Sequence, residues 1–336
     1  MPRTLIISDY GNFIGLHSER LVVKKGDEII KEEPLFRIDE IIVGKAGVSL
    51  SADIINESVK RGIRISFMDN TGMPYAMLTS PHLSAVNKHR RAQIEAYNNE
   101  IGFLFSRNIV CGKIKNQINL LKYSGKYIKQ TKPLFFDEYN ENIIAMEKLY
   151  SDTKRLEGIN IDDKRQELLG YEGKSSSLYW NGFSKITGTE GIFKREHQGS
   201  KDTVNSMLNY GYGILYNRIW AAILLAGLEP YAGFMHTDRP GKPSLVLDLI
   251  EEFRQPIVDR SIIAIMNRGI KIEIKDGLLE SESRKIIATA ILERLEESVT
   301  YKSMNYSLNS IIQMQAREAA KVFYGKEEYK SYRFKW

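Results

Sequence analysis

Residues 235–256, MHTDRPGKPSLVLDLIEEFRQP, bring together side chains that could hold a metal ion. His236 precedes a turn that contains Pro240, Gly241 and Pro243, and a run of acids follows the turn. Two prolines and a glycine make a stiff turn, which could hold the imidazole against the next helix. Carboxylate oxygens with one neutral imidazole suit Mn²⁺ or Mg²⁺ and do not resemble a structural zinc site.

The segment 245–257 has the spacing of one amphipathic α-helix. At 3.6 residues per turn its apolar side chains share one side: Val246, Leu249, Ile250, Phe253 and Ile257. Its polar side chains share the opposite side: Asp248, Glu251, Glu252 and Gln255. That side is either a metal site or an ordinary solvated face, since acids near a helix start are favourable. No basic residue is spaced to pair with these acids before Arg254, which weighs against the solvated face.

A further ligand has to come from elsewhere in the chain. In YEGKSSSLYWNGF, Glu172 is predicted to open a helix, and the serines that follow it make this segment unusually polar. An acid near a helix N-terminus is common and favourable, so a purely structural role stays open for Glu172.

The elements that must position these residues change character near residue 80. Before it, short segments rich in branched and aromatic residues predict strands: RTLIIS, RLVVKKGDEIIKEE, DEIIVGK, IRISFMD and PYAMLTS. One helix is predicted, with Ser51 as its cap and Gly62 at its end. Residues 1–80 are therefore expected to form a small, mostly antiparallel β-rich domain.

After Pro81 the pattern becomes helical. Apolar residues at three-to-four spacing predict helices over 84–110, 139–156, 202–226, 282–300 and 304–323. The expected fold class is α+β, with a linker at 81–87 and a larger all-α domain at 88–336. The glycines of NYGYGILYNRI fit close helix packing better than ligand contact, and the charged tail GKEEYKSYRFKW is expected to be mobile.

Composition limits the classes of protein that this chain can represent. Its 336 residues suggest about two domains, and an apolar fraction of 43% with a charged fraction of 27% is ordinary for a globular protein. No long apolar run or signal-like start is present, so we expect a cytoplasmic protein without a membrane partner. Cys111 stands alone and is expected to be a buried structural thiol.

The net charge of +6 is unevenly placed along the chain. Between Glu100 and Asp137 there are no acids and a run of cations: Arg107, Lys113, Lys115, Lys122, Lys126, Lys129 and Lys132. This stretch is either a solvated helix face or a surface for a polyanion, and charge alone does not decide between them.

Four blocks in this order resemble the signature of one known family: YEGKSSSLYW, DTVNSMLNYGYGILYNRI, GLEPYAGFMH and SLVLDLIEEFRQPIVD. That family is the CRISPR-associated endonuclease and integrase of spacer acquisition, the first Cas protein family. The likeness covers nearly the whole chain, because those proteins also have a β-rich N-terminal domain and a helical C-terminal one.

The resemblance implies which residues form the active site. The family's metal glutamate falls on Glu172 and its metal histidine on His236. Its third carboxylate falls on Glu251 as first choice with Asp248 beside it, and Glu252 is a weaker candidate. The implied ion is Mn²⁺ or Mg²⁺.

The resemblance also implies function and partners. A 3′-hydroxyl of spacer-precursor DNA would attack a CRISPR repeat, in a homodimer joined by a small second Cas protein. Candidate contacts to the DNA backbone are Lys88, Arg90, Arg91, Lys113, Lys115, Lys242 and Arg254. Two alternatives stay open, a metal-dependent nuclease of DNA repair and a non-catalytic DNA-binding scaffold.

Overall fold

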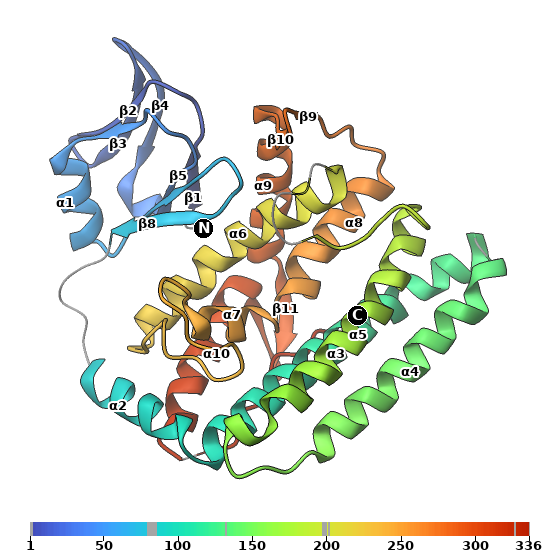
Figure 1. Cartoon of the computed structure of the whole chain (residues 1–336). Helices are drawn as coiled ribbons and strands as arrows, with labels where there is room; N and C mark the ends of the chain where they lie inside the picture. Colours follow the sequence, from blue (N-terminus) through green and yellow to red (C-terminus); the bar gives the residue numbers. More distant parts are fainter. Residues whose placement is uncertain are drawn as a thin grey trace.

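A computed structural model describes residues 3–78, 86–131, 133–196, 200, 202–325 and 327–335. A β-rich region is followed by a larger helical region (Figure 1), which confirms the predicted α+β class. Most of the predicted linker at 81–87, together with Lys132, lies outside the described residues. No helix in the described ranges is long and apolar enough to cross a membrane.

The N-terminal region contains two four-stranded sheets with the orders β1-β5-β7-β8 and β4-β3-β2-β6. Its elements are β1 (Arg3–Ile7), β2 (Asn12–His17), β3 (Arg20–Lys25), β4 (Glu28–Pro34), a 3₁₀ turn (Leu35–Arg37), β5 (Ile38–Val43), β6 (Ser49–Leu50), α1 (Ala52–Lys60), β7 (Arg64–Met68) and β8 (Pro74–Leu78). Strand β2 has no counterpart among the predicted strands. Helix α1 begins at the predicted cap Ser51, whose side chain accepts a hydrogen bond from the Ile54 amide.

The predicted antiparallel pairing accounts for only part of this region. β1–β5, β5–β7 and β2–β6 pair in parallel, whereas β2–β3, β3–β4 and β7–β8 are antiparallel. The connection between β5 and β7 contains α1. A crossover connection of this kind allows the two neighbouring strands to run in the same direction.

The helical region consists of nine α-helices and several shorter elements among the described residues. The helices are α2 (Val86–Tyr97), α3 (Glu100–Thr131), α4 (Phe136–Arg155), α5 (Ile161–Thr187), α6 (Thr203–Leu225), α7 (Ser244–Ile250), α8 (Arg260–Asn267), α9 (Ser281–Glu296) and α10 (Leu308–Phe323). The shorter elements are a 3₁₀ turn (Pro133–Phe135), a π-helix (Arg254–Asp259), and the hairpins β9 (Ile274–Lys275) with β10 (Leu278–Leu279) and β11 (Ser298–Tyr301) with β12 (Met304–Ser307).

Several predicted helix bounds need correction. The predicted helix at 84–110 is two helices, because the side chain of Asn99 accepts a hydrogen bond from the Ile101 amide and starts α3 afresh. Helix α3 then continues to Thr131, far beyond the predicted end. The ends of the helices predicted at 282–300 and 304–323 are instead strands β11 and β12.

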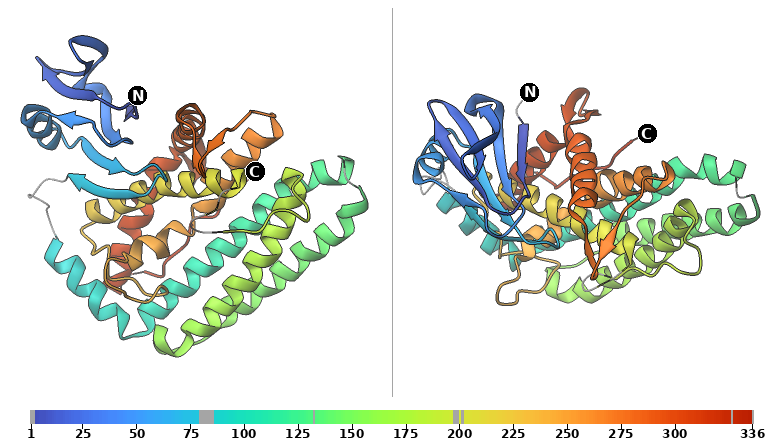
Figure 2. Two further views of the ribbon diagram at one scale, coloured as in Figure 1. Left: turned by 45° about the horizontal axis from the view of Figure 1, so that its top comes forward. Right: turned by 90° about the horizontal axis from the view of Figure 1, so that it is seen from above.

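The long helices α3, α4 and α5 lie side by side, with α6 crossing between them and the β-rich region (Figures 1 and 2). The basic stretch that the sequence singled out forms α3, most of which is buried. Cys111 on this helix is also buried, and burial raises the pKa of its thiol to about 11, as expected for a structural thiol.

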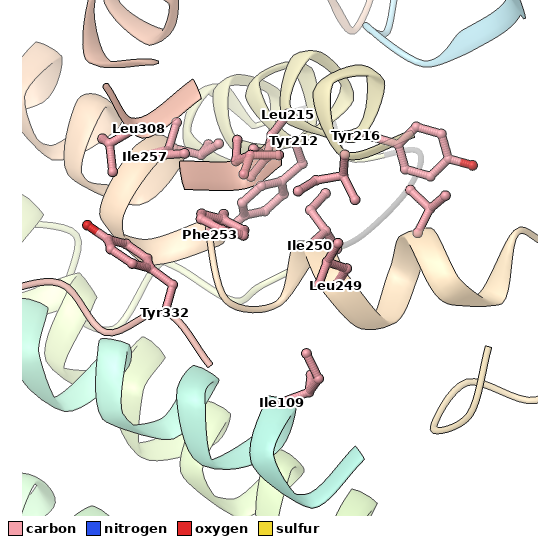
Figure 3. Packing of buried hydrophobic residues seen from close by; sticks show 14 of the residues in the cluster. Ile109, Tyr212, Leu215, Tyr216, Leu249, Ile250, Phe253, Ile257, Leu308 and Tyr332 are labelled. Carbon is pink, nitrogen blue, oxygen red and sulfur yellow. The ribbon is translucent and has the colours of Figure 1, made fainter. Parts of the chain in front are cut away.

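Residues 245–257 do not form one helix, since α7 ends at Ile250 and a π-helix begins at Arg254. Their apolar side chains face α6, as Figure 3 shows for Leu249, Ile250 and Phe253. Of the two alternatives for the polar side, the ordinary solvated face is excluded. The polar side chains on the other side are all buried: Asp248 at 1% exposure, Glu251 at 3%, Glu252 at 0% and Gln255 at 1%.

The C-terminal residues 327–335, which we call the C-terminal strap, are docked rather than mobile. Tyr329, Tyr332 and Phe334 are buried in it, and Tyr332 stacks on Phe253 with ring centroids 5.4 Å apart. The side-chain amides of Asn116 and Asn119 on α3 donate to the carbonyls of Tyr332 and Phe334. The charged composition suggested mobility, but alternating aromatic residues anchor this segment to the core.

Close packing at glycines joins the two regions, as the sequence predicted for NYGYGILYNRI. A methyl group on Gly213 of α6 would overlap the backbone of Gly72 in the turn before β8. Nearby, Arg218 Nη2 of α6 lies 2.8 Å from Oε2 of the fully buried Glu40 on β5. A buried ion pair and a backbone contact therefore fix α6 against the β-rich region.

We expect Gly213→Ala to lower the free energy of unfolding by about 1–3 kcal/mol, because the added carbon forces the two regions apart. The matched control is Gly170→Ala on α5, where a Cβ meets nothing within 4 Å. That change should stabilise the protein by up to about 1 kcal/mol through helix propensity. Denaturant titrations followed by circular dichroism measure both, and equal effects of the two variants would contradict the close contact.

Candidate active site

One buried carboxylate organises the loop that carries His236. Asp248 on α7 accepts hydrogen bonds from the backbone amides of Phe234 and Met235 through Oδ2, at 2.7 and 3.1 Å. Its Oδ1 accepts from the His236 amide at 3.0 Å and from the ring Nδ1 at 2.7 Å. Gly233 sits so close to Ser244 that no side chain would fit there. The segment that carries His236 is therefore held directly against the start of α7.

These hydrogen bonds determine the chemical state of His236. Because an ionised carboxylate can only accept, Nδ1 carries the proton that it donates to Asp248, which fixes the tautomer in which Nε2 has the lone pair. The imidazole is 23% exposed, so Nε2 can reach a ligand or a proton. Asp248 has both oxygens engaged, and it therefore fits a positioning role better than the role of a direct ligand.

Two acids from different elements meet at one ammonium group. Lys113 of α3 forms an ion pair with Oε1 of Glu172 and another, at 2.5 Å, with Oε2 of Glu251. Glu172 lies in the middle of α5 and does not open a helix, contrary to expectation. The polar run after it has a function here, because Ser176 Oγ donates to Glu172 Oε1. Lys113 thus joins α3, α5 and the segment that follows α7.

A second cation completes the charge balance at Glu251. Nη2 of Arg254 lies 3.0 Å from Oε1 of Glu251, and its guanidinium lies over the ring of Tyr212. Burial alone would raise the pKa of the Glu251 carboxyl, but Arg254 and Lys113 outweigh burial and lower that pKa to about 2. Glu251 is therefore ionised across the physiological range.

Glu252 points the other way and belongs to the core. It accepts hydrogen bonds from the Tyr329 hydroxyl, the Tyr332 amide and the Gln315 side chain. Burial raises the pKa of this carboxyl to about 7. Glu252 therefore links the segment after α7 to the C-terminal strap, and its surroundings do not suit a metal ligand.

The donor types of Glu172, Glu251 and His236 fit a hard divalent ion. In the described part of the chain, however, no three histidine, cysteine, aspartate or glutamate side chains converge closely enough to hold one. The ammonium of Lys113 lies between the two carboxylates instead. The ligand set given by the resemblance stays a prediction.

The candidate DNA contacts fall into two groups. Lys113 and Arg254 are internal partners of the acids. Exposed or half-buried positions hold the others: Lys88, Arg90, Arg91, Lys115 and Lys242. Of these, Arg90 pairs with Glu229, and Lys115 lies over the ring of Tyr150.

Comparison with known proteins identifies the family. The sequence profile described as CRISPR associated protein Cas1 matches residues 5–293. The chain belongs to the Cas1 family. A CRISPR-associated endonuclease Cas1 from Francisella tularensis subsp. novicida is 37% identical over 333 residues, which cover 99% of each chain.

Solved structures agree with this Cas1 fold. A casposase bound to integration product matches with a TM-score of 0.82 at 23% identity, over 100% of this chain and 95% of that chain. A Cas6-RT-Cas1–Cas2 complex matches with a TM-score of 0.77 at 21% identity, over 99% of this chain and 36% of that chain. At these identities the likeness shows the fold alone.

Sequence reasoning missed three features of the Cas1 site. It treated Lys113 as a DNA contact, gave Ser176 no role and left the C-terminal strap unattached. Only the strap left a usable signal, the spacing of Tyr329, Tyr332 and Phe334. The ion pairs of Lys113 join residues far apart in the chain, and spacing does not reveal them.

We expect Tyr329→Phe to lower the free energy of unfolding by about 1–3 kcal/mol, because it removes a hydrogen bond from the buried Glu252. Tyr10→Phe is the control, since Tyr10 is 71% exposed. Denaturant unfolding measures both variants. Equal stability of Tyr329→Phe and the wild type would show that the Tyr329 hydroxyl does not couple the strap to Glu252.

Proposed function

We propose that this Cas1 protein is a metal-dependent DNA nuclease and integrase that inserts spacer DNA into a CRISPR array. The observation that carries the proposal is the convergence of Glu172 and Glu251 on one cationic point, from two different elements. His236 adds the ring nitrogen Nε2, and Asp248 fixes the tautomer of the ring. Family membership supplies the biological setting.

Glu172, Glu251 and His236 would hold Mn²⁺ or Mg²⁺, which would polarise a phosphoryl oxygen and stabilise charge on the departing oxygen. Glu251 is ionised, as a ligand must be, because its neighbouring cations lower the pKa of its carboxyl. Asp248 fixes the tautomer and orientation of the His236 ring, and Arg254 keeps Glu251 in place. No serine, cysteine or lysine nucleophile is needed, because a water or a DNA 3′-hydroxyl attacks directly.

Spacer-precursor DNA and the CRISPR repeat are the proposed substrates. The structural relative bound to an integration product and the complex that contains Cas2 support DNA and Cas2 as partners. Joining both strands of a duplex needs two active sites, so we propose a homodimer bridged by Cas2.

The two alternatives fare differently. The non-catalytic DNA-binding scaffold assumed that the acidic face is merely solvated, whereas these acids are buried and paired. A DNA-repair nuclease would use the same site with water as its nucleophile, and the nature of the attacking group distinguishes it from an integrase.

We expect Glu172→Gln, His236→Ala and Glu251→Gln each to reduce Mn²⁺-dependent cleavage and strand joining by at least about 100-fold, since each removes a ligand. Glu167→Gln on the same helix is the matched control, because Glu167 pairs with the exposed Lys164 outside the site. Gel assays with labelled duplexes and a plasmid that carries a repeat array measure both reactions.

Duplexes with 3′-dideoxy ends separate the two chemistries. Joining should disappear with these duplexes while metal-dependent nicking persists. Full activity of the His236→Ala protein would contradict the metal site, and a wild-type protein that nicks DNA but never joins 3′-hydroxyl ends would favour the repair nuclease.

A further inference from the structure

The side chain of Lys113 is placed unusually for a lysine of a DNA-processing protein. It is 11% exposed, and its ammonium contacts one oxygen of Glu172 and one of Glu251. The ammonium of Lys113 is therefore directed into the site and not toward bulk solvent.

The charges of this cluster already cancel. Glu172 and Glu251 contribute two negative charges, and Lys113 and Arg254 contribute two positive ones. Arg254 pairs with Oε1 of Glu251, whereas Lys113 pairs with both acids and so joins them. Without that bridge, two carboxylates from separate elements would repel each other across a poorly solvated gap.

The ammonium also occupies the space that a bridging ion would need. A divalent ion held by both acids must lie about 2.0–2.6 Å from an oxygen of each, and the ammonium contacts these same two oxygens. Two cations cannot share that position. Lys113 and the metal ion therefore compete for the same ligands.

We infer that Lys113 is a counter-cation that holds the carboxylates of Glu172 and Glu251 close together in the metal-free protein. Its ammonium moves away from them when a divalent ion binds. This inference rests on the metal site of the proposed function. A lysine stem is flexible enough to redirect its ammonium, and the anion nearest to a catalytic metal is the phosphate of bound DNA. The exchange makes the metal ion and DNA bind cooperatively, because DNA offers the displaced ammonium a new partner.

Lys113→Met tests this exchange, because methionine retains an unbranched apolar stem without the charge. Calorimetric titration of the full-length protein with MnCl₂ should give a dissociation constant about 10-fold lower for Lys113→Met than for the wild type. A DNA duplex with 3′-dideoxy ends should tighten Mn²⁺ binding by the wild type several-fold and by Lys113→Met much less. Lys148→Met, at an exposed position of α4 outside the candidate DNA contacts, should behave as the wild type does.

Unchanged or weaker Mn²⁺ binding by Lys113→Met would overturn the inference and leave Lys113 as a simple support for the acids. A second measurement needs no variant, in case Lys113→Met does not fold. Amine acetylation of the wild type, followed by mass spectrometry, should label Lys113 several-fold faster after MgCl₂ is added, while the exposed Lys126 stays constant. Equal labelling of Lys113 with and without MgCl₂ would also overturn the inference.

Glu172→Gln separates this inference from the proposed function. If Mn²⁺ binding survives unchanged in Glu172→Gln, the metal site itself is wrong. If binding depends on Glu172 but Lys113→Met does not tighten it, only the role of Lys113 fails.

Discussion

The need to neutralise buried charge governs the centre of this protein. Glu251 is 4% exposed at its side chain, and an ionised carboxylate at that depth is tolerated only with partners. Lys113 from α3 and Arg254 from the π-helix supply them, and Lys113 also reaches Glu172 on α5. The ion pairs that neutralise these charges therefore hold three separate elements together at one point.

Three neighbouring acids meet this requirement in three different ways. Asp248 takes its hydrogen bonds from backbone amides and His236, and so shapes a loop. Glu251 takes cations and faces the site. Glu252 takes hydroxyl and amide donors from the C-terminal strap. Neighbouring acids in this segment therefore have separate partners from distant parts of the chain.

Local signals predicted much of the architecture. The change from strands to helices near residue 80, the cap at Ser51 and the close packing of α6 through Gly213 are confirmed, because they depend on neighbours in the chain or on the absence of a side chain. Parallel strand pairing and the docking of the strap depend on contacts between distant segments. Strand content and a charged tail sequence carry no information about such partners.

The sequence by itself determined which donors this protein possesses, since an imidazole and carboxylates at these spacings restrict the chemistry before any fold is known. It also determined family membership, through motif blocks that extend over most of the chain. Only the tertiary structure decided that Asp248 orients His236, that Glu252 belongs to the core and that Lys113 lies between Glu172 and Glu251. The physical reason is that spacing along a helix defines a face, whereas the partner of a buried charge depends on which distant segment packs against that face.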